Sequence, residues 1–193
     1  MLVGMPDLRI AQDPVADKVL SDDPFALLAG MMLDQQFPME RAFAGPAKVL
    51  DRFGSLDPAA IAAADPERFA VLCSEPPAIH RFPGSTAARL QALAAHVVEE
   101  YDGDTARLWN EAGTGKELVA RLTALPGFGK QKAQIFVALL GKQLGVTPAG
   151  WEQAAGDYSE PGSFRSVADV VDAGSLERVR AFKQEMKAAA RKK

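Results

Sequence analysis

Two apolar helical stripes that meet at a very short turn constrain the fold of this chain more than any other feature. One stripe lies in residues 115–124 and the other in residues 130–143, each with the three- and four-residue spacing of an amphipathic helix. The turn between them reads Leu-Pro-Gly-Phe-Gly-Lys (residues 125–130), which is long enough only for a tight reversal of direction. The sequence therefore predicts a helical hairpin over residues 115–143.

The turn also has the features of an anion-binding site. Gly127 and Gly129 can adopt positive φ angles and leave their amide groups uncovered. Because Gly129 has no side chain to cap the second helix, the first amides of that helix stay free, and Lys130 and Lys132 add positive charge nearby. Helix N-termini of this kind bind phosphate. The turn by itself leaves two interpretations open, a nucleic-acid contact and an ordinary hairpin with a glycine cap.

Three segments together resemble the helix-hairpin-helix (HhH-GPD) superfamily of base-excision DNA glycosylases, named for a hairpin, a Gly/Pro-rich loop and a catalytic Asp. The hairpin pattern L-x-x-L-P-G-x-G-x-x-x-A covers residues 122–133. Residues 23–36 are similar to the first conserved helix of the superfamily, which ends in a Gln-Gln pair facing DNA. Residues 82–93 are similar to the turn and helix that lead towards the hairpin. The nearest resemblance is to the alkylpurine (3-methyladenine type) glycosylases.

This resemblance implies an all-α fold in which two helical lobes enclose a cleft for the flipped base. It implies double-stranded DNA as the partner of a monomeric protein. Gln35 and Gln36 would lie at the DNA, where one of them fills the space left by the flipped nucleotide, unless it only caps its helix. The other expected DNA contacts all lie in the hairpin: Gly127, Phe128, Gly129, Lys130 and Lys132.

The catalytic carboxylate is where this chain departs from the family pattern. The resemblance implies an Asp about two dozen residues after the start of the Leu-Pro-Gly turn, where its charge would stabilise a cationic sugar. Residues 148–151 stand there instead, without an Asp. The candidates are Asp157, in a loop, and Asp169, ahead of the last helix, and each could instead be a solvated loop acid. A second function therefore stays open, namely a hairpin protein that binds DNA or recognises a lesion without cleaving it.

The position of the Schiff-base lysine in bifunctional family members is occupied here by Gln131. Neighbouring residues on a helix differ in direction by about 100°, so neither Lys130 nor Lys132 is a simple replacement. We therefore expect a monofunctional glycosylase that uses water as the nucleophile and has no β-lyase activity. Flipped bases stack on aromatic side chains, and Trp151 and Tyr158, in a polar, Gly-rich neighbourhood, are the pocket candidates.

Cysteine usage restricts the cofactors. Cys73 is the only cysteine, so the chain cannot supply the four thiolates of the iron–sulfur cluster that the endonuclease-three-type and adenine-mismatch-type glycosylases usually carry. With two histidines and no cysteine cluster, we expect no metal site and no cofactor, apart from room for a monovalent cation at the hairpin.

The net charge of −3 is not that of a generic nucleic-acid-binding protein, but the charges are unevenly distributed. Residues 176–193 carry seven Lys or Arg residues and two Glu residues, which suits either a phosphate contact or the solvated end of a helix. No apolar run reaches the roughly 18 residues of a membrane span, and the start of the chain has no secretory pattern. We expect a cytoplasmic, nucleoid-associated protein.

Helical periodicity and Gly/Pro punctuation divide the sequence into helices without a convincing strand, and we expect one domain over residues 1–193 that ends in a basic helix (175–193). Four Asp-Pro pairs have the pattern of an N-cap followed by proline in the first turn. The expected helices span residues 14–20, 24–34, 39–53, 58–63, 66–72, 85–101, 104–111, 115–124, 130–143 and 175–190.

Overall fold

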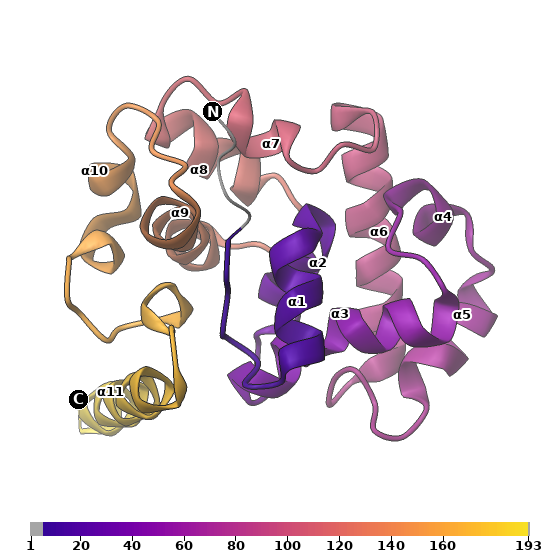
Figure 1. The fold of residues 1–193 in the computed structure, drawn as a ribbon, viewed down its shortest axis with the longest axis horizontal. Helices are drawn as coiled ribbons and strands as arrows, with labels where there is room; N and C mark the ends of the chain where they lie inside the picture. Colours follow the sequence, from indigo (N-terminus) through magenta and orange to yellow (C-terminus); the bar gives the residue numbers. More distant parts are fainter. Residues whose placement is uncertain (1–5, 193) are drawn as a thin grey trace.

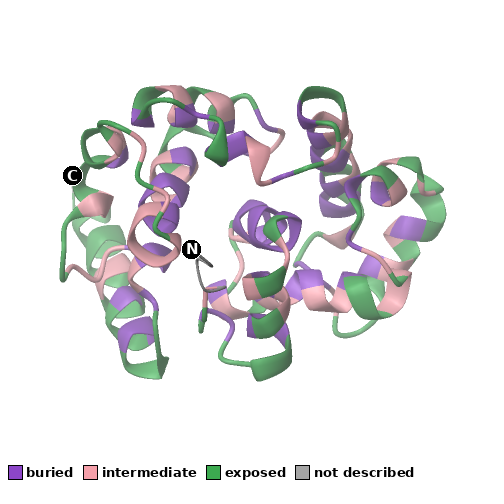
Figure 2. Cartoon of the chain, turned by 45° about the horizontal axis from the view of Figure 1, so that its top comes forward, coloured by how far each residue is buried: buried purple, intermediate pink, exposed green. Residues whose placement is uncertain are grey.

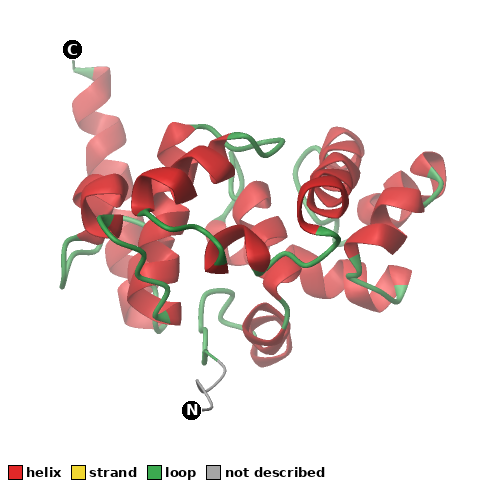
Figure 3. Ribbon diagram, turned by 90° about the horizontal axis from the view of Figure 1, so that it is seen from above, coloured by secondary structure: helices red, strands yellow, loops and turns green. Residues whose placement is uncertain are grey.

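The computed structural model describes residues 6–192, so the first five residues and the last lysine of the predicted basic cluster lie outside the described part. Within residues 6–192 the secondary structure is helical and contains no strand (Figure 3), which confirms the all-α prediction. The α-helices are α1 (Pro14–Asp22), α2 (Pro24–Leu33), α3 (Met39–Phe53), α4 (Pro58–Ala63), α5 (Pro66–Ser74), α6 (Pro83–Tyr101), α7 (Arg107–Asn110), α8 (Gly115–Thr123), α9 (Lys130–Leu144), α10 (Trp151–Ala155) and α11 (Ala173–Arg191). Two short 3-10 helices, η1 (Gly156–Ser159) and η2 (Val167–Asp169), follow α10.

The Asp-Pro pairs begin four of these helices, as the sequence predicts. In each case the Asp side chain accepts a hydrogen bond from an amide of the first turn, and the Pro occupies the first helical position. A cap of this kind stabilises a helix by about 1 kcal/mol. The capping residues are Asp13, Asp23, Asp57 and Asp65.

Other boundaries differ from the predicted ones. The helix expected over residues 104–111 shortens to α7, because the Asp104 carboxylate accepts a hydrogen bond from the amide of Ala106 and holds the chain in a turn. α6 begins at Pro83 rather than at residue 85. The segment 156–163, expected as a loop, starts with η1.

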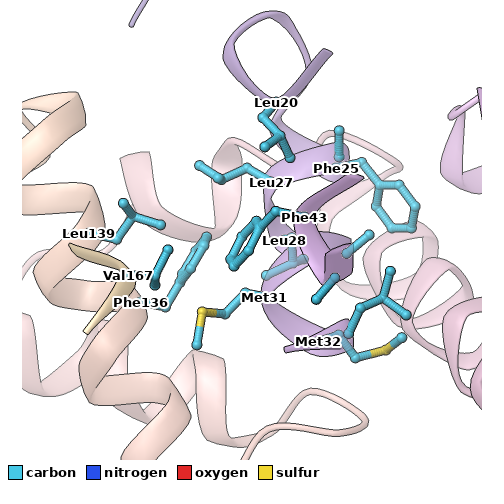
Figure 4. Close-up of a cluster of buried hydrophobic side chains, with 14 of the residues drawn as sticks. Leu20, Phe25, Leu27, Leu28, Met31, Met32, Phe43, Phe136, Leu139 and Val167 are labelled. Atoms are coloured by element: carbon cyan, nitrogen blue, oxygen red, sulfur yellow. The ribbon is translucent and has the colours of Figure 1, made fainter. Parts of the chain in front are cut away.

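α2 is the central helix of the structure. Every residue from Phe25 to Leu33 is buried, and a helix that is apolar on all sides belongs in a core. Figure 1 shows α1 and α2 in the middle, with α8 to α11 on one side and α3 to α6 on the other, and Figure 2 shows the buried positions turned inwards. Figure 4 shows side chains of α2, among them Met31, close to Phe136 of α9 and Val167 of η2. The end of α2 is therefore held in place from several directions.

α8 and α9 pack against each other as the predicted hairpin. At its start the hairpin meets α10 so closely that a Cβ on Gly115 would lie 2.5 Å from the Cα of Trp151. The amide of Gly115 donates a hydrogen bond of 2.8 Å to the carbonyl of Ala149. The core therefore fixes the hairpin against both α2 and the segment that follows it. The arrangement as two lobes stays a prediction.

Candidate functional site

The hairpin turn presents an open helix N-terminus. Gly127 has a φ of 82°, and a Cβ there would lie 2.8 Å from the Cδ of Arg89 and 3.0 Å from the Cγ of Met32, so this position requires glycine. Gly129 has a φ of −93°, which corrects the expectation of a positive φ at both glycines. It is the N-cap of α9 without any side-chain hydrogen bond, and no atom lies within 4 Å of the position that its Cβ would take. The amides at the start of α9 therefore face open space.

Two of the predicted DNA contacts in the hairpin point inwards. The Phe128 side chain is 6% exposed and packs edge-on against Phe136, with 6.3 Å between the ring centroids. The Lys132 ammonium donates a hydrogen bond of 3.0 Å to the carbonyl of Met32, in the last turn of α2. Lys130 and the backbone at Gly129 are exposed. The exposed part of the hairpin is thus the turn itself, while Phe128 and Lys132 attach the hairpin to the core.

Lys132 and Asp34 influence each other electrostatically at the end of α2. Burial lowers the pKa of Lys132 from 10.5 to about 8, against the opposing effect of the Asp34 carboxylate. Burial raises the pKa of Asp34, and the positive charges of Lys183 and Lys132 oppose that rise. Shifted pKa values of this kind concentrate at functional sites.

The Gln-Gln pair lies in a loop that a buried histidine fixes. Gln35 and Gln36 are both exposed, and Gln36 has a positive φ of 54°. The Nδ1 atom of His80 accepts a hydrogen bond from the amide of Phe82, so Nε2 carries the proton and donates it to the carbonyl of Gln35 at 2.8 Å. The His80 ring also packs on Phe37, with 5.0 Å between the centroids. The loop therefore presents both glutamine side chains outwards on a fixed backbone.

An exposed aromatic side chain stands beside this loop. Phe82 is 48% exposed, and the guanidinium of Arg81 lies 5.3 Å from the centroid of its ring. A depression of about 200 Å³ separates Phe82 from the glutamines and is also lined by Arg89. Sequence reasoning missed this residue, although an aromatic side chain directly before the Pro-Gly start of α6 was a visible signal.

A larger cleft lies between the glutamine loop and the basic helix. It has a volume of about 540 Å³ and is lined by residues 34 and 36–39 on one side and by α11 on the other. Gln36 lines both this cleft and the smaller depression. An ion pair between Glu40 and Arg180 joins the two walls. The α11 residues that line the cleft are Arg180, Lys183, Gln184 and Lys187.

A comparison with protein-family models matches residues 29–193 to the HhH-GPD superfamily base excision DNA repair protein. The chain belongs to this superfamily. The matched segment contains the glutamine loop, the hairpin and α11. Membership in this superfamily indicates that the protein acts on DNA in base excision repair. Searches of curated proteins and of solved structures found no significant match.

The two aspartates expected as catalytic residues do not line the cleft between the glutamine loop and α11. The Asp169 side chain is 5% exposed and forms an ion pair of 2.6 Å with Lys142 of α9. It also accepts a hydrogen bond of 2.8 Å from the amide of Arg165, so its oxygens are used to hold the segment around η2. Asp157 is exposed in η1, and neither aspartate lines the cleft.

The two aromatic residues expected to form the base pocket do not line the cleft either. The Trp151 ring packs on α9, where a Cβ on Gly141 would lie 2.4 Å from its Cζ3 atom. The Tyr158 hydroxyl accepts a hydrogen bond of 2.9 Å from the side chain of Gln131. The structure thus gives both residues contacts with α9, because the chain after the hairpin folds back along that helix.

No group of three or more His, Cys, Asp or Glu residues between residues 6 and 192 could hold a metal ion. Cys73 is buried, and burial raises the pKa of its thiol to about 11, which leaves it protonated and unreactive at neutral pH. In the same part of the chain, no helix is both long and apolar enough to cross a membrane.

Proposed function

We propose that this protein is a monofunctional DNA N-glycosylase that releases damaged bases, alkylated bases among them, by hydrolysis of the glycosidic bond. The observation that carries the proposal is the cleft of about 540 Å³ in which the glutamine loop faces the cations of α11. A flipped nucleotide needs such a recess, and its flanking phosphates need positive charge close by.

The hairpin would hold one phosphate of the damaged strand through the free amides at Gly129 and the charge of Lys130. Such a contact contributes about 0.3–1 kcal/mol, and up to about 2 kcal/mol when it is partly buried. Flipping a base costs a few kcal/mol, so the hairpin alone does not supply it. We assign the rest of the free energy needed for base flipping to two further contacts. Phe82 would enter the base stack, and Gln35 or Gln36 would fill the vacated space.

The absence of lyase activity is part of the proposal. The position of the family's Schiff-base lysine is occupied by Gln131, which donates its hydrogen bond to Tyr158. Lys132, the next candidate, is directed towards the carbonyl of Met32. With one cysteine in the whole sequence, we further propose that the enzyme works without an iron–sulfur cluster, as a monomer on double-stranded DNA.

A second candidate function is lesion binding without cleavage. It is favoured by the position of Asp157 and Asp169, neither of which lines the cleft.

One experiment separates the two functions. The protein is incubated with duplexes that carry a panel of alkylated and other damaged bases, and free base, abasic sites and strand breaks are measured separately. Release of free base, with strand breaks only after alkali, supports the glycosylase. Tight, lesion-specific binding without base release supports the second function. Strand breaks without alkali, together with a covalent complex trapped by borohydride, would contradict the monofunctional assignment.

A further inference from the structure

We propose that Asp34, at the end of α2, is the catalytic carboxylate of this protein, in place of an acid that follows the hairpin. The inference rests on the proposed glycosylase function and assigns the residue that performs its central step. Three properties of Asp34 carry it: its position in the cleft, a carboxylate without a hydrogen-bond partner among residues 6–192, and the charges that surround it.

The position of Asp34 is fixed by the core. Asp34 is the C-cap of α2, and its amide donates hydrogen bonds of 3.1 and 3.3 Å to the carbonyls of Gly30 and Met31. The helix that it ends is buried along its length. Its side chain lines the cleft beside Gln36, on the wall that faces α11. A rigid element thus presents the carboxylate to the space where a flipped nucleotide would lie.

The carboxylate is free for another partner. Among residues 6–192, the groups that act on Asp34 do so through burial and charge alone, without a hydrogen bond. Other aspartates differ in this respect: Asp17 accepts hydrogen bonds from the amides of Ile10 and Ala11, and Asp169 is bound by Lys142. The oxygens of those carboxylates are already bound to groups that hold the fold together. A partly buried carboxylate without such partners can accept a hydrogen bond from water or face a cationic sugar.

The surrounding charges come from three elements. Burial disfavours the ionised form of Asp34 most strongly, Lys183 of α11 and Lys132 of α9 favour it, and Glu40 of α3 adds a smaller unfavourable effect. The net effect raises the pKa of Asp34 from its ordinary value, which makes the carboxylate a stronger base. Arg180 and Lys187 line the same cleft and add positive charge that would hold the flanking phosphates.

The chemical step follows from these properties. For an alkylated base that carries a positive charge, the bond between the sugar C1′ and the base nitrogen breaks, and its electron pair leaves with the base, which becomes neutral. The negative charge of Asp34 stabilises the cationic sugar that develops. The oxygen of a water molecule then bonds to C1′, and the water gives one proton to Asp34, which passes it to solvent. The products are the free base, an abasic site and one proton.

The test replaces Asp34 with a neutral side chain of nearly the same shape, Asp34→Asn. Asp51→Asn is the matched control, because Asp51 is exposed on α3 away from the cleft. Base release is measured under single-turnover conditions on the lesion that the parent protein processes best. Binding is measured with a duplex that contains an uncleavable abasic-site analogue. We expect Asp34→Asn to lose at least about 100-fold in rate and to keep its affinity for the analogue, while Asp51→Asn behaves like the parent.

Further measurements make the outcomes distinguishable. The rate of the parent should fall as the pH drops through the pKa of Asp34, and the residual rate of Asp34→Asn should lack this dependence. Asp34→Ser serves as a second variant, since burial and charge are the only influences on the Asp34 carboxylate within residues 6–192 and no hydrogen bond there depends on it. If both variants release base at the parent rate, the inference is overturned and the glycosylase stands. If Asp157→Asn or Asp169→Asn abolishes release instead, an acid after the hairpin is the catalyst. If the parent releases no base from the whole panel, the proposed function fails and the inference fails with it.

Discussion

The ammonium group of Lys132 donates a hydrogen bond to the carbonyl of Met32 across a sequence separation of 100 residues. This contact joins the second helix of the hairpin to the last turn of α2, directly before Asp34 and the glutamine loop. The element that would bind phosphate and the element that would meet the flipped nucleotide therefore share one polar contact. Because the lysine is partly buried there, its titration affects the stability of the fold.

The first prediction concerns the dependence of stability on pH. The pKa of Lys132 is lowered from 10.5 in the unfolded chain to about 8 in the folded protein. Between these two values the unfolded chain binds more protons than the folded one, so this residue makes the free energy of unfolding increase as the pH rises from 8 to 10.5. In Lys132→Met the increase should be absent. Urea unfolding of the parent and of Lys132→Met over this pH range measures the effect. If their free energies of unfolding differ by the same amount at every pH, the pKa of Lys132 is not lowered.

The second prediction concerns the hairpin turn. Gly129→Asp places a negative charge where a phosphate would bind, and the position has room for a side chain, so the variant should fold. We expect duplex binding to weaken by about 1–2 kcal/mol, equally for all sequences, since a phosphate contact carries no base information. Gly129→Ala is the control and should bind nearly as tightly as the parent. Unchanged affinity of a folded Gly129→Asp protein would remove the hairpin from the DNA interface.

The helix caps and the hairpin could be predicted from the sequence because they depend on residues close together in the chain. Asp23 and Pro24 fix the start of α2 through one local hydrogen-bonded turn. The direction of a side chain on a packed helix depends instead on distant partners. Lys132 has a charge next to the hairpin turn, but its ammonium group donates a hydrogen bond to the carbonyl of Met32. That preference arises only when α2 and α9 have packed together.

The candidate catalytic acids show the same limit of prediction from sequence, because their partners are distant in the chain. Asp169 is a candidate in the sequence because it precedes the last helix, yet Lys142 binds it in a buried ion pair. Asp34 directly precedes the Gln-Gln pair and was therefore visible in the sequence. Its role could be inferred only from the burial of its carboxylate and its position in the cleft, because an aspartate at the end of a helix is ordinarily a solvated residue without further function.

The third prediction concerns salt. Lys130 and the cations of α11 suggest that about three to five phosphates are neutralised, so the slope of log K against log salt concentration should be about −3 to −5 on duplex DNA. Lys183→Gln removes a cation that lines the cleft and should reduce the magnitude of the slope by about 0.9. Lys18→Gln is the control, because the Lys18 side chain is 75% exposed on α1 and does not line the cleft, and it should leave the slope unchanged. A slope near zero for the parent would mean that neither the hairpin nor α11 meets DNA.

The fourth prediction concerns the ion pair of Lys142 and Asp169, whose side chains are 15% and 5% exposed. Removal of one member of a buried pair leaves the other charge uncompensated, so Asp169→Asn should lower the free energy of unfolding by about 3–5 kcal/mol. In the double variant with Lys142→Met the loss should be smaller than the sum of the two single losses, because no charge is left unpaired. Denaturant unfolding of the three variants measures this coupling. If Asp169→Asn instead kept its stability and lost base release, Asp169 would be the catalytic acid, and its ion pair would serve to position a reacting group.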